Sequence, residues 1–278
     1  MRVVVTNDDG VHAPGLWALV RALRPICDII VCAPDRDRSG VGTSLTLVGP
    51  VRAMKMFPQV DGVETYGIDG TPGDAAILGI KQLAGGPVDV LVSGINAGNN
   101  ISFTVAVSGT VGAALHARLA GIPAIAISAH TLLDFDNPQI AAVSRAMVAA
   151  VANRTADPPP LLNVNFPAID PKGCADHTHT PNTSPMAGVM LTTLADMDVI
   201  YEVTPEKRGL RTYFWNSFTG PNLPVTPEMD GTDLQALIHG YVSVTPLNRS
   251  LGHGESLEAP EAVKAALRGA SEALAKFG

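Results

Sequence analysis

Short runs of strand-forming residues alternate with segments of helical periodicity through the first 130 residues. Arg2–Thr6 is rich in β-branched residues, and Pro14–Leu23 follows with leucine and valine at helical spacing. Such alternation is typical of a parallel sheet covered by helices on both faces, so we predict a three-layer α/β domain with a mostly parallel sheet. Further segments continue it: strands Asp28–Ala33, Val88–Ser93 and Ala124–Ser128, and helices Pro72–Leu83, Ser108–Leu119 and Gln139–Val151.

Strand-like segments without helices between them interrupt this alternation. Ser44–Met56 and Thr65–Ile68 favour an antiparallel pair, and Leu161–Asn165 is typical of one more buried strand. From about residue 170 to 240 the pattern indicates an extended β arm more than a second globular core. Its short strand-like runs are separated by proline, glycine and asparagine: Val189–Thr193, Ile200–Val203 and Thr212–Trp215.

The last segment, Pro260–Phe277, has the pattern of an amphipathic helix. The default interpretation is that its narrow apolar stripe packs on its own domain, but a stripe at the chain end also suits exchange with a partner subunit. We expect a core over residues 1–170, a β-rich arm that returns to the core over 171–247, and an oligomerising C-terminal helix over 248–278. The stripe consists of Val263, Leu267, Ala270 and Leu274.

The composition narrows the class of protein. Hydrophobic residues make up 46% of the 278 residues and charged residues 16%, so the chain can form a core and is not mainly disordered. With 19 basic and 26 acidic residues it lacks the positive field that binds nucleic-acid polymers, although a metal ion or backbone N–H groups can still hold a single nucleotide. No apolar stretch reaches the roughly eighteen residues of a membrane span, and the start contains charges unlike a signal peptide. We expect a cytoplasmic protein that binds neither membranes nor nucleic-acid polymers.

Polar loops follow three of the predicted strands, at the end where the chain leaves each strand. They are Asn7–Gly10, Ala33–Gly40 and Ser93–Asn100. In an open parallel sheet, ligands bind outside the carboxyl ends of the strands. We therefore expect these loops to converge at one edge of the sheet and to form a single site.

Asp8 and Asp9 are adjacent carboxylates that repel each other unless a cation lies beside them. Oxygen ligands of this kind suit a hard divalent ion, Mg²⁺ or Mn²⁺, and Ser39 and Asn96 are natural further ligands in the neighbouring loops. Each of these residues alone is more often a turn residue or a helix cap, so the metal hypothesis depends on the loops meeting.

The segment Ser108–Thr110 opens an apolar helix, so its backbone N–H groups, including that of Gly109, could bind a phosphate; a plain N-cap at Ser108 is compatible with this role. The motifs of P-loop NTPases, dinucleotide-binding enzymes and α/β-hydrolases are absent from the sequence. His12 is a candidate acid or base, although a structural hydrogen bond at the helix start is its commoner role.

Together these loops resemble those of the SurE (survival protein E) family of metal-dependent 5′-nucleotidases. The resemblance implies a Rossmann-like core, one divalent metal ion held by residues matching Asp8, Asp9, Ser39 and Asn96, and hydrolysis of nucleoside 5′-monophosphates to nucleoside and phosphate. It also implies a homodimer or homotetramer built by an exchanged C-terminal helix and the β arm. The likeness runs in order through Asn7–Gly15, Ala33–Arg36, Ser39–Gly40, Ser44–Leu47, Gly70–Pro72, Ser93–Gly98, Ser108–Val111, Thr232–Asp233 and Gly240–Leu247.

The mechanistic hypothesis is hydrolysis assisted by that cation, with Asp8 and Asp9 as catalytic residues. Backbone N–H groups of Ser108, Gly109 and Thr110, together with Asn7 or Asn99, would stabilise charge on the phosphate oxygens. A covalent aspartyl-phosphate on Asp8 or Asp9 is the rival mechanism. Three other functions stay open: a non-catalytic regulator that binds a nucleotide or metal, an oligomer that a metal merely stabilises, and an exopolyphosphatase-like activity at the same site.

Overall fold

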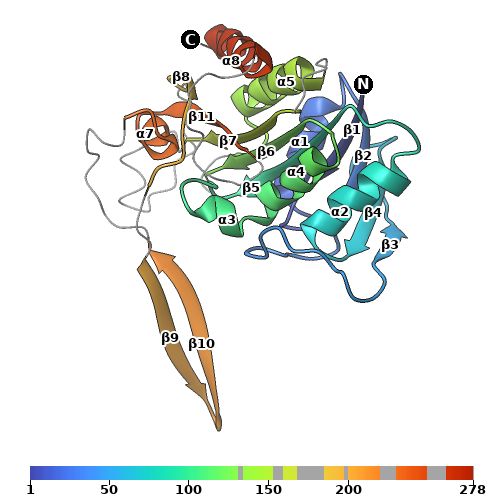
Figure 1. The fold of residues 1–278 in the computed structure, drawn as a ribbon, viewed down its shortest axis with the longest axis vertical. Coiled ribbons are helices and arrows are strands. Elements are labelled where there is room, and N and C mark those ends of the chain that lie inside the picture. The colour runs from blue at the N-terminus through green and yellow to red at the C-terminus, as the bar shows by residue number, and fades with distance from the viewer. Residues whose placement is uncertain are drawn as a thin grey trace.

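The computed structural model of the chain describes residues 1–130, 134–152, 159–167, 185–196, 200–219, 230–248 and 261–277. These residues fold around one nine-stranded sheet with helices on both faces, and a separate two-stranded sheet projects from the body (Figure 1). The strands of the large sheet are β1 (Arg2–Thr6), β2 (Asp28–Pro34), β3 (Arg52–Lys55), β4 (Glu64–Asp69), β5 (Val90–Ala97), β6 (Ala124–Ala129), β7 (Leu161–Phe166), β8 (Gly188–Leu191) and β11 (Tyr241–Pro246).

The strand order across the large sheet is β3-β4-β2-β1-β5-β6-β7-β11-β8. The six neighbouring strands from β4 to β7 run parallel to one another, which confirms the predicted parallel sheet. Only the flanks contain antiparallel pairs, β3 with β4 and β11 with β7. Since helices cover both faces, central runs such as Val3–Val5 are fully buried, as their unbroken apolar sequence predicts.

Two helical layers enclose the sheet. One apolar core lies between the sheet and the layer of α1, α5 and α8, and a second lies on the opposite face under α2 and α4 (Figure 1). Within the described ranges, no helix is long and apolar enough to cross a membrane. The helices are α1 (Pro14–Leu23), α2 (Pro72–Leu78), α3 (Thr104–Val107), α4 (Gly109–Leu119), α5 (Pro138–Ala152), α7 (Asp233–Ile238) and α8 (Glu261–Leu274).

Three predicted elements differ from the observed ones. The strand predicted over Ser44–Met56 is limited to β3, because residues before it form a loop that is bound to α2 by side-chain hydrogen bonds. The helix predicted over Pro72–Leu83 is α-helical only in α2, and Gly79–Leu83 continues as a π-helical turn. β5 begins and ends later than predicted, and its pairing with β6 shifts register between Ser93 and Asn96.

Within the described part of the predicted arm, β8 joins the edge of the large sheet through β11, whereas β9 (Ile200–Arg208) and β10 (Arg211–Thr219) form an antiparallel hairpin that extends away from the body (Figure 1). We call this hairpin the arm. The predicted boundary at residue 170 lies outside the described residues, and the division of the chain into three parts stays a prediction.

The C-terminal helix α8 packs against α5 and β8 of its own chain. Val263, Ala270 and Leu274 are buried there, while Leu267 is half-buried beside them. The interpretation that this stripe packs on its own domain is therefore confirmed. Exchange of the helix with a partner subunit stays a prediction.

Candidate active site

The order in which the chain adds strands to the sheet reverses between β1 and β5, two strands that lie side by side. From β1 the chain proceeds through β2 to β4 on one side, and then returns to build β5, β6 and β7 on the other side. A crevice outside the carboxyl ends of the strands at such a reversal is the usual ligand site of a parallel sheet. The loops after β1, β2 and β5 all leave from this edge, as the sequence predicts.

Asp8 and Asp9 lie in the loop directly after β1. Asp8 is almost completely buried, with 3% of its surface exposed, and Asp9 is half-buried. Burial raises the pKa of Asp8, against the opposing effect of hydrogen bonds from Thr110. Burial and the negative charge of Asp8 raise the pKa of Asp9 to about 6. Buried carboxylates of this kind are inconsistent with a solvated turn and favour a site that a cation neutralises.

The N-terminus of α4 faces Asp8. The hydroxyl of Thr110 donates a hydrogen bond to Asp8 Oδ1, and Ser108 caps the helix by accepting from the N–H of Val111 at 3.1 Å. A Cβ on Gly109 would lie 2.8 Å from Asp8 Cβ and 2.9 Å from Asp8 Oδ2, so only glycine permits this approach. The positive end of the helix dipole therefore lies beside the carboxylate and beside any anion bound there.

The residues next to Ser39 and Asn96 in the sequence contact the loop that carries the two aspartates. The N–H of Arg38 donates to Asp8 O at 2.8 Å, which places the Ser39 loop against the loop after β1. The N–H of Ala97 lies 3.4 Å from Asp9 Oδ2. Asn96 donates through Nδ2 to Gly98 O at 2.7 Å, so its Oδ1 is the oxygen that could bind a metal. The structure thus brings the predicted ligand loops together, and metal coordination by these four residues stays a prediction.

Asp37 is a third carboxylate at this edge that sequence reasoning did not select. Its Oδ1 accepts from the hydroxyl of Ser39 at 2.6 Å and from the N–H of Ser39 at 2.7 Å. The negative charge of Asp37 also raises the pKa of both Asp8 and Asp9. The sequence holds one signal that could have identified Asp37. It lies two residues before Ser39, a position from which an aspartate side chain commonly accepts a hydrogen bond from the backbone N–H.

The donor set fits a hard divalent cation. Asp8, Asp9 and Asp37 supply negative charge, and Ser39 and Asn96 supply neutral oxygens, which is the chemistry that Mg²⁺ and Mn²⁺ prefer. Among the described residues, no group of three or more histidine, cysteine, aspartate or glutamate side chains is arranged to hold a metal ion. A metal at this edge would therefore need the hydroxyl and amide ligands as well as the carboxylates.

Asn7 and Asn99, the predicted phosphate contacts, already have partners. Asn7 donates from Nδ2 to Gly10 O at 3.0 Å and accepts from the N–H of Gly10 at 3.2 Å, which fixes the turn that carries the aspartates. Asn99 donates from Nδ2 to Phe166 O at 3.0 Å. Contact of either side chain with phosphate stays a prediction and would compete with these bonds.

Two histidines bear on the predicted acid or base. His12 is exposed just before α1. The N–H of Gly98 donates to Ala129 O at 2.9 Å, so the next residue, His130, lies at the carboxyl end of β6 beside the Asn96 loop. Burial lowers the pKa of the His130 imidazole. His130 is a candidate proton donor or acceptor that sequence reasoning missed; its position two residues after the predicted strand Ala124–Ser128 was the available signal.

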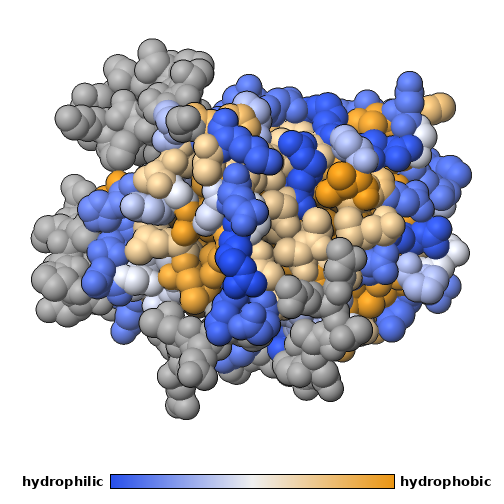
Figure 2. Space-filling model, turned by 90° about the horizontal axis from the view of Figure 1, so that it is seen from above, coloured by the Kyte–Doolittle hydropathy of each residue, from blue (hydrophilic) through white to orange (hydrophobic). Residues whose placement is uncertain are grey.

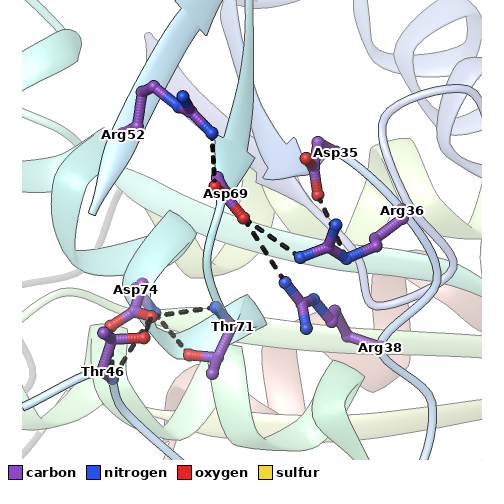
Figure 3. A network of polar contacts seen from close by, with 8 residues as sticks. All are labelled: Asp35, Arg36, Arg38, Thr46, Arg52, Asp69, Thr71 and Asp74. Atoms are coloured by element: carbon purple, nitrogen blue, oxygen red, sulfur yellow. Dashed lines mark hydrogen bonds and ion pairs between the residues drawn. The ribbon is translucent and has the colours of Figure 1, made fainter. Parts of the chain in front are cut away.

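The arginines of the loop after β2 are paired outside the aspartate cluster. Figure 3 shows Arg36, Arg38 and Arg52 converging on Asp69, at the end of β4. Their Nη2 atoms lie 3.1, 3.8 and 2.7 Å from the Asp69 carboxylate oxygens, in that order. Consequently the charges that shift the pKa of Asp9 are carboxylates rather than guanidinium groups.

Comparisons with known proteins agree with the sequence resemblance. The family model for Survival protein SurE matches residues 3–194. A protein of Geobacter metallireducens named 5′-nucleotidase SurE is 39% identical over 260 residues, which cover 92% of this chain and 95% of that protein. A Thermus thermophilus protein named 5′-nucleotidase SurE 1 is 39% identical over 259 residues, covering 91% and 94% of the two chains. The crystal structure of the SurE protein from Aquifex aeolicus has a TM-score of 0.70 and 32% identity, and the match covers 91% of this chain and 95% of that one. On this sequence and structural similarity, the chain belongs to the SurE family.

Proposed function

We propose that this protein hydrolyses nucleoside 5′-monophosphates to nucleoside and phosphate, with one divalent metal ion, Mg²⁺ or Mn²⁺, held by Asp8, Asp9, Ser39 and Asn96. The observation that carries the proposal is buried Asp8, bonded by Thr110 at the N-terminus of α4 and followed by half-buried Asp9, in a chain whose relatives are named 5′-nucleotidases. Cytoplasmic location is part of the same proposal and rests on the sequence alone.

The chain's own groups have distinct parts in the reaction. Thr110 orients the Asp8 carboxylate through Oδ1, and the neighbouring loop backbone holds Asp9. The N–H groups of Ser108, Gly109 and Thr110, at the positive end of α4, would stabilise charge on the phosphate oxygens, and for Thr110 this role competes with its backbone bond to Asp8. A divalent ion, when bound, supplies further charge neutralisation and makes water more acidic. Positioning and charge neutralisation account for most phosphoryl-transfer catalysis, so no nucleophilic side chain is required.

The test is phosphate release from a panel of nucleoside 5′- and 3′-monophosphates and polyphosphate, with Mg²⁺, with Mn²⁺ and with EDTA. We expect metal-dependent release from the 5′-monophosphates that EDTA abolishes. Asp8→Asn should lower the rate at limiting metal at least a hundredfold, because the site loses a charged ligand. Asp28→Asn is the matched control: this exposed carboxylate pairs with Arg2 at the opposite end of the strands.

Each outcome of the panel has a definite meaning. No release from any substrate by folded protein would contradict the proposal and favour a binding regulator. Release from polyphosphate alone would assign a different substrate to the same site. Near-wild-type turnover of Asp8→Asn at limiting metal would show that the proposed ligand set is wrong.

We further propose that the protein is a homodimer or homotetramer that associates through α8 and the arm. The arm is long and carries exposed apolar side chains, with exposed fractions of 58% for Val203, 66% for Phe214 and 57% for Trp215. A groove of about 360 Å³ between α5 and α8 is lined both by small residues such as Ala146 and Gly269 and by charged ones such as Arg145. Figure 2, which looks onto the side where α5 and α8 lie, shows apolar residues interspersed with polar ones on this face. We therefore base the proposed association on the exposed apolar side chains that lie together on the arm.

Light scattering after size-exclusion chromatography tests the association. We expect the mass of a dimer or tetramer, and a lower state for the double variant Phe214→Ser, Trp215→Ser. Phe57→Ser is the matched control, because Phe57 is 98% exposed but lies next to β3 rather than on the arm. A monomer at all concentrations would contradict the proposal.

A further inference from the structure

The segments on either side of the arm meet at its base. The N–H of Thr193 donates to Gly231 O at 3.0 Å, and the N–H of Asp233 donates to Thr193 O at 2.8 Å. The chain therefore leaves the body after Ala195 and returns at Gly231 beside the point of departure. In Figure 1 the arm leaves on the side of the body where α3 and α7 lie.

Asp233 is a completely buried carboxylate at this junction. Its Oδ1 accepts from the N–H of Ala195 at 2.9 Å and from the N–H of Leu234 at 2.8 Å. Its Oδ2 accepts from the N–H of Ser102 at 2.9 Å. One side chain thus joins the segment that precedes the arm in sequence, the start of α7 that follows it, and a residue 131 positions earlier in the chain.

Ser102 belongs to the segment that follows Asn96. It has a φ of 52°, which is uncommon for a residue other than glycine and needs support from its surroundings. The hydroxyl of Ser102 donates to Ala195 O at 2.7 Å, so Ser102 contacts the base of the arm through both its backbone and its side chain. These two contacts hold the backbone of Ser102 in its unusual conformation.

Buried asparagines fix the middle of the same segment. The N–H of Asn100 donates to Asn165 Oδ1 at 2.8 Å, and Asn100 Nδ2 donates to Ser128 Oγ at 2.8 Å. Asn163 Nδ2 in turn donates to Asn100 O at 2.8 Å. The loop that follows β5 is consequently anchored to β6 and β7 in its middle and to Asp233 at Ser102.

We propose that Asp233 is a positioning residue for metal binding: by holding Ser102 it fixes the loop after β5, to which the Asn96 side chain is bonded through Gly98 O, and it couples that loop to the segments that flank the arm. This inference rests on the proposed function, because it takes Asn96 as a metal ligand. A carboxylate is required, because two oxygens must accept from N–H groups on different sides; an amide would present its own N–H₂ to one of them.

The test compares the metal affinity of variants in which one buried residue is replaced. Asp233→Asn keeps the size of the side chain but can accept on one side only. Thr192→Val is the matched control: Thr192 is 1% exposed and its hydroxyl bonds Ser243 and Thr245, so the variant loses buried hydrogen bonds nearby without contacting the Asn96 loop. Ser102→Ala removes only the bond to Ala195 O and is the milder second variant.

Two readouts are measured for each variant. The first is the Mn²⁺ concentration at the midpoint of metal-induced thermal stabilisation, which does not depend on activity. The second is the Mn²⁺ concentration for half-maximal phosphate release from a nucleoside 5′-monophosphate. For Asp233→Asn we expect both to rise about tenfold, the order of effect of one lost bond to a charged group, with kcat at saturating Mn²⁺ within about twofold of wild type. Ser102→Ala should shift both in the same direction by less, and Thr192→Val should leave both unchanged.

Equal Mn²⁺ midpoints for Asp233→Asn, Thr192→Val and wild type would overturn the inference. A similar rise in all variants would overturn it as well, because the effect would then follow general destabilisation. If Asp233→Asn does not fold, an unshifted midpoint for Ser102→Ala would be enough to overturn it. The thermal measurement needs no turnover, so failure of the positioning role is distinguishable from failure of the proposed hydrolysis.

Discussion

Removing the negative charge of Asp9 should raise the free energy of unfolding when no metal is present and lower it when metal is bound. In the folded protein without metal the pKa of Asp9 is raised from 3.8 to about 6 by burial and by the charge of Asp8. Below pH 3.8 the carboxyl is protonated in both the folded and the unfolded state, so it contributes nothing. As the pH rises from 3.8 to 6 the unfolded state loses its proton first, and the folded state becomes less stable by a growing amount. Above pH 6 this penalty is complete.

The magnitude follows from the size of the shift. A change from 3.8 to about 6 corresponds to about 3 kcal/mol when no solvent reduces the interaction. Asp9 is only half-buried, so screening reduces the expected penalty to about 1–2 kcal/mol. Asp9→Asn removes the charge and retains an oxygen that can accept from the N–H of Ala97. Without metal at pH 7.5, the variant should therefore be more stable than wild type by about 1–2 kcal/mol.

Urea unfolding in EDTA between pH 4 and 8 measures this difference directly. The free energies of unfolding of the two proteins should agree near pH 4 and diverge as the pH approaches 6.5. With saturating Mn²⁺ at pH 7.5 the order should reverse, because binding to the folded state stabilises wild type more than the variant. A variant that is equally stable or less stable than wild type in EDTA at pH 7.5 would refute the reasoning. The ionised Asp9 carboxylate would then not destabilise the folded protein without metal.

Three further substitutions follow from the contacts around the site. Gly109→Ala places a methyl group 2.8 Å from Asp8 Cβ, so we expect at least a tenfold loss of kcat/KM and about 1–3 kcal/mol of stability in urea unfolding; unchanged kinetics would contradict the close approach. Thr110→Val removes the hydroxyl that orients Asp8 and should lower kcat/KM about tenfold, measured at saturating metal, with little change in fold by circular dichroism. Asp74→Asn weakens the bonds to Thr46 and Thr71, and urea unfolding should show a loss of about 1–3 kcal/mol with unchanged metal affinity.

Local sequence patterns predicted the parts of the fold that local chemistry determines. The strand Arg2–Thr6 and the helix Pro14–Leu23 have the predicted bounds, because an apolar run and an apolar periodicity state directly which faces are buried. The loop before β3 could not be predicted in this way. Its N–H at Thr46 is bound by Asp74, 28 residues later, which replaces the strand partner that the pattern suggested. Contacts of such sequence separation leave no periodic signal.

The same distinction applies to the candidate site. The positions of Asp8 and Asn96 after apolar strands indicated a common edge, and the sheet order brings their loops together. Asp37 was missed because it lies in a run of alternating charges, Asp35–Arg38, that is typical of a solvated loop. Only the folded chain shows that Asp37 turns toward Ser39. Asp233 lies within one of the segments that carry the family likeness, but its link to Ser102 depends on a contact that no local pattern encodes.

The arrangement of charge explains how an acidic site can exist beside several arginines. The backbone N–H of Arg38 binds the loop of Asp8, whereas its guanidinium group is directed to Asp69, together with that of Arg36 (Figure 3). These ion pairs are partly exposed and contribute little to stability. Their effect is on the charge balance: guanidinium groups that pair with Asp69 do not offset the rise in the pKa of Asp8 and Asp9, which burial causes first and neighbouring carboxylates increase. A divalent cation bound beside these carboxylates, as proposed, would offset this unfavourable burial of charge.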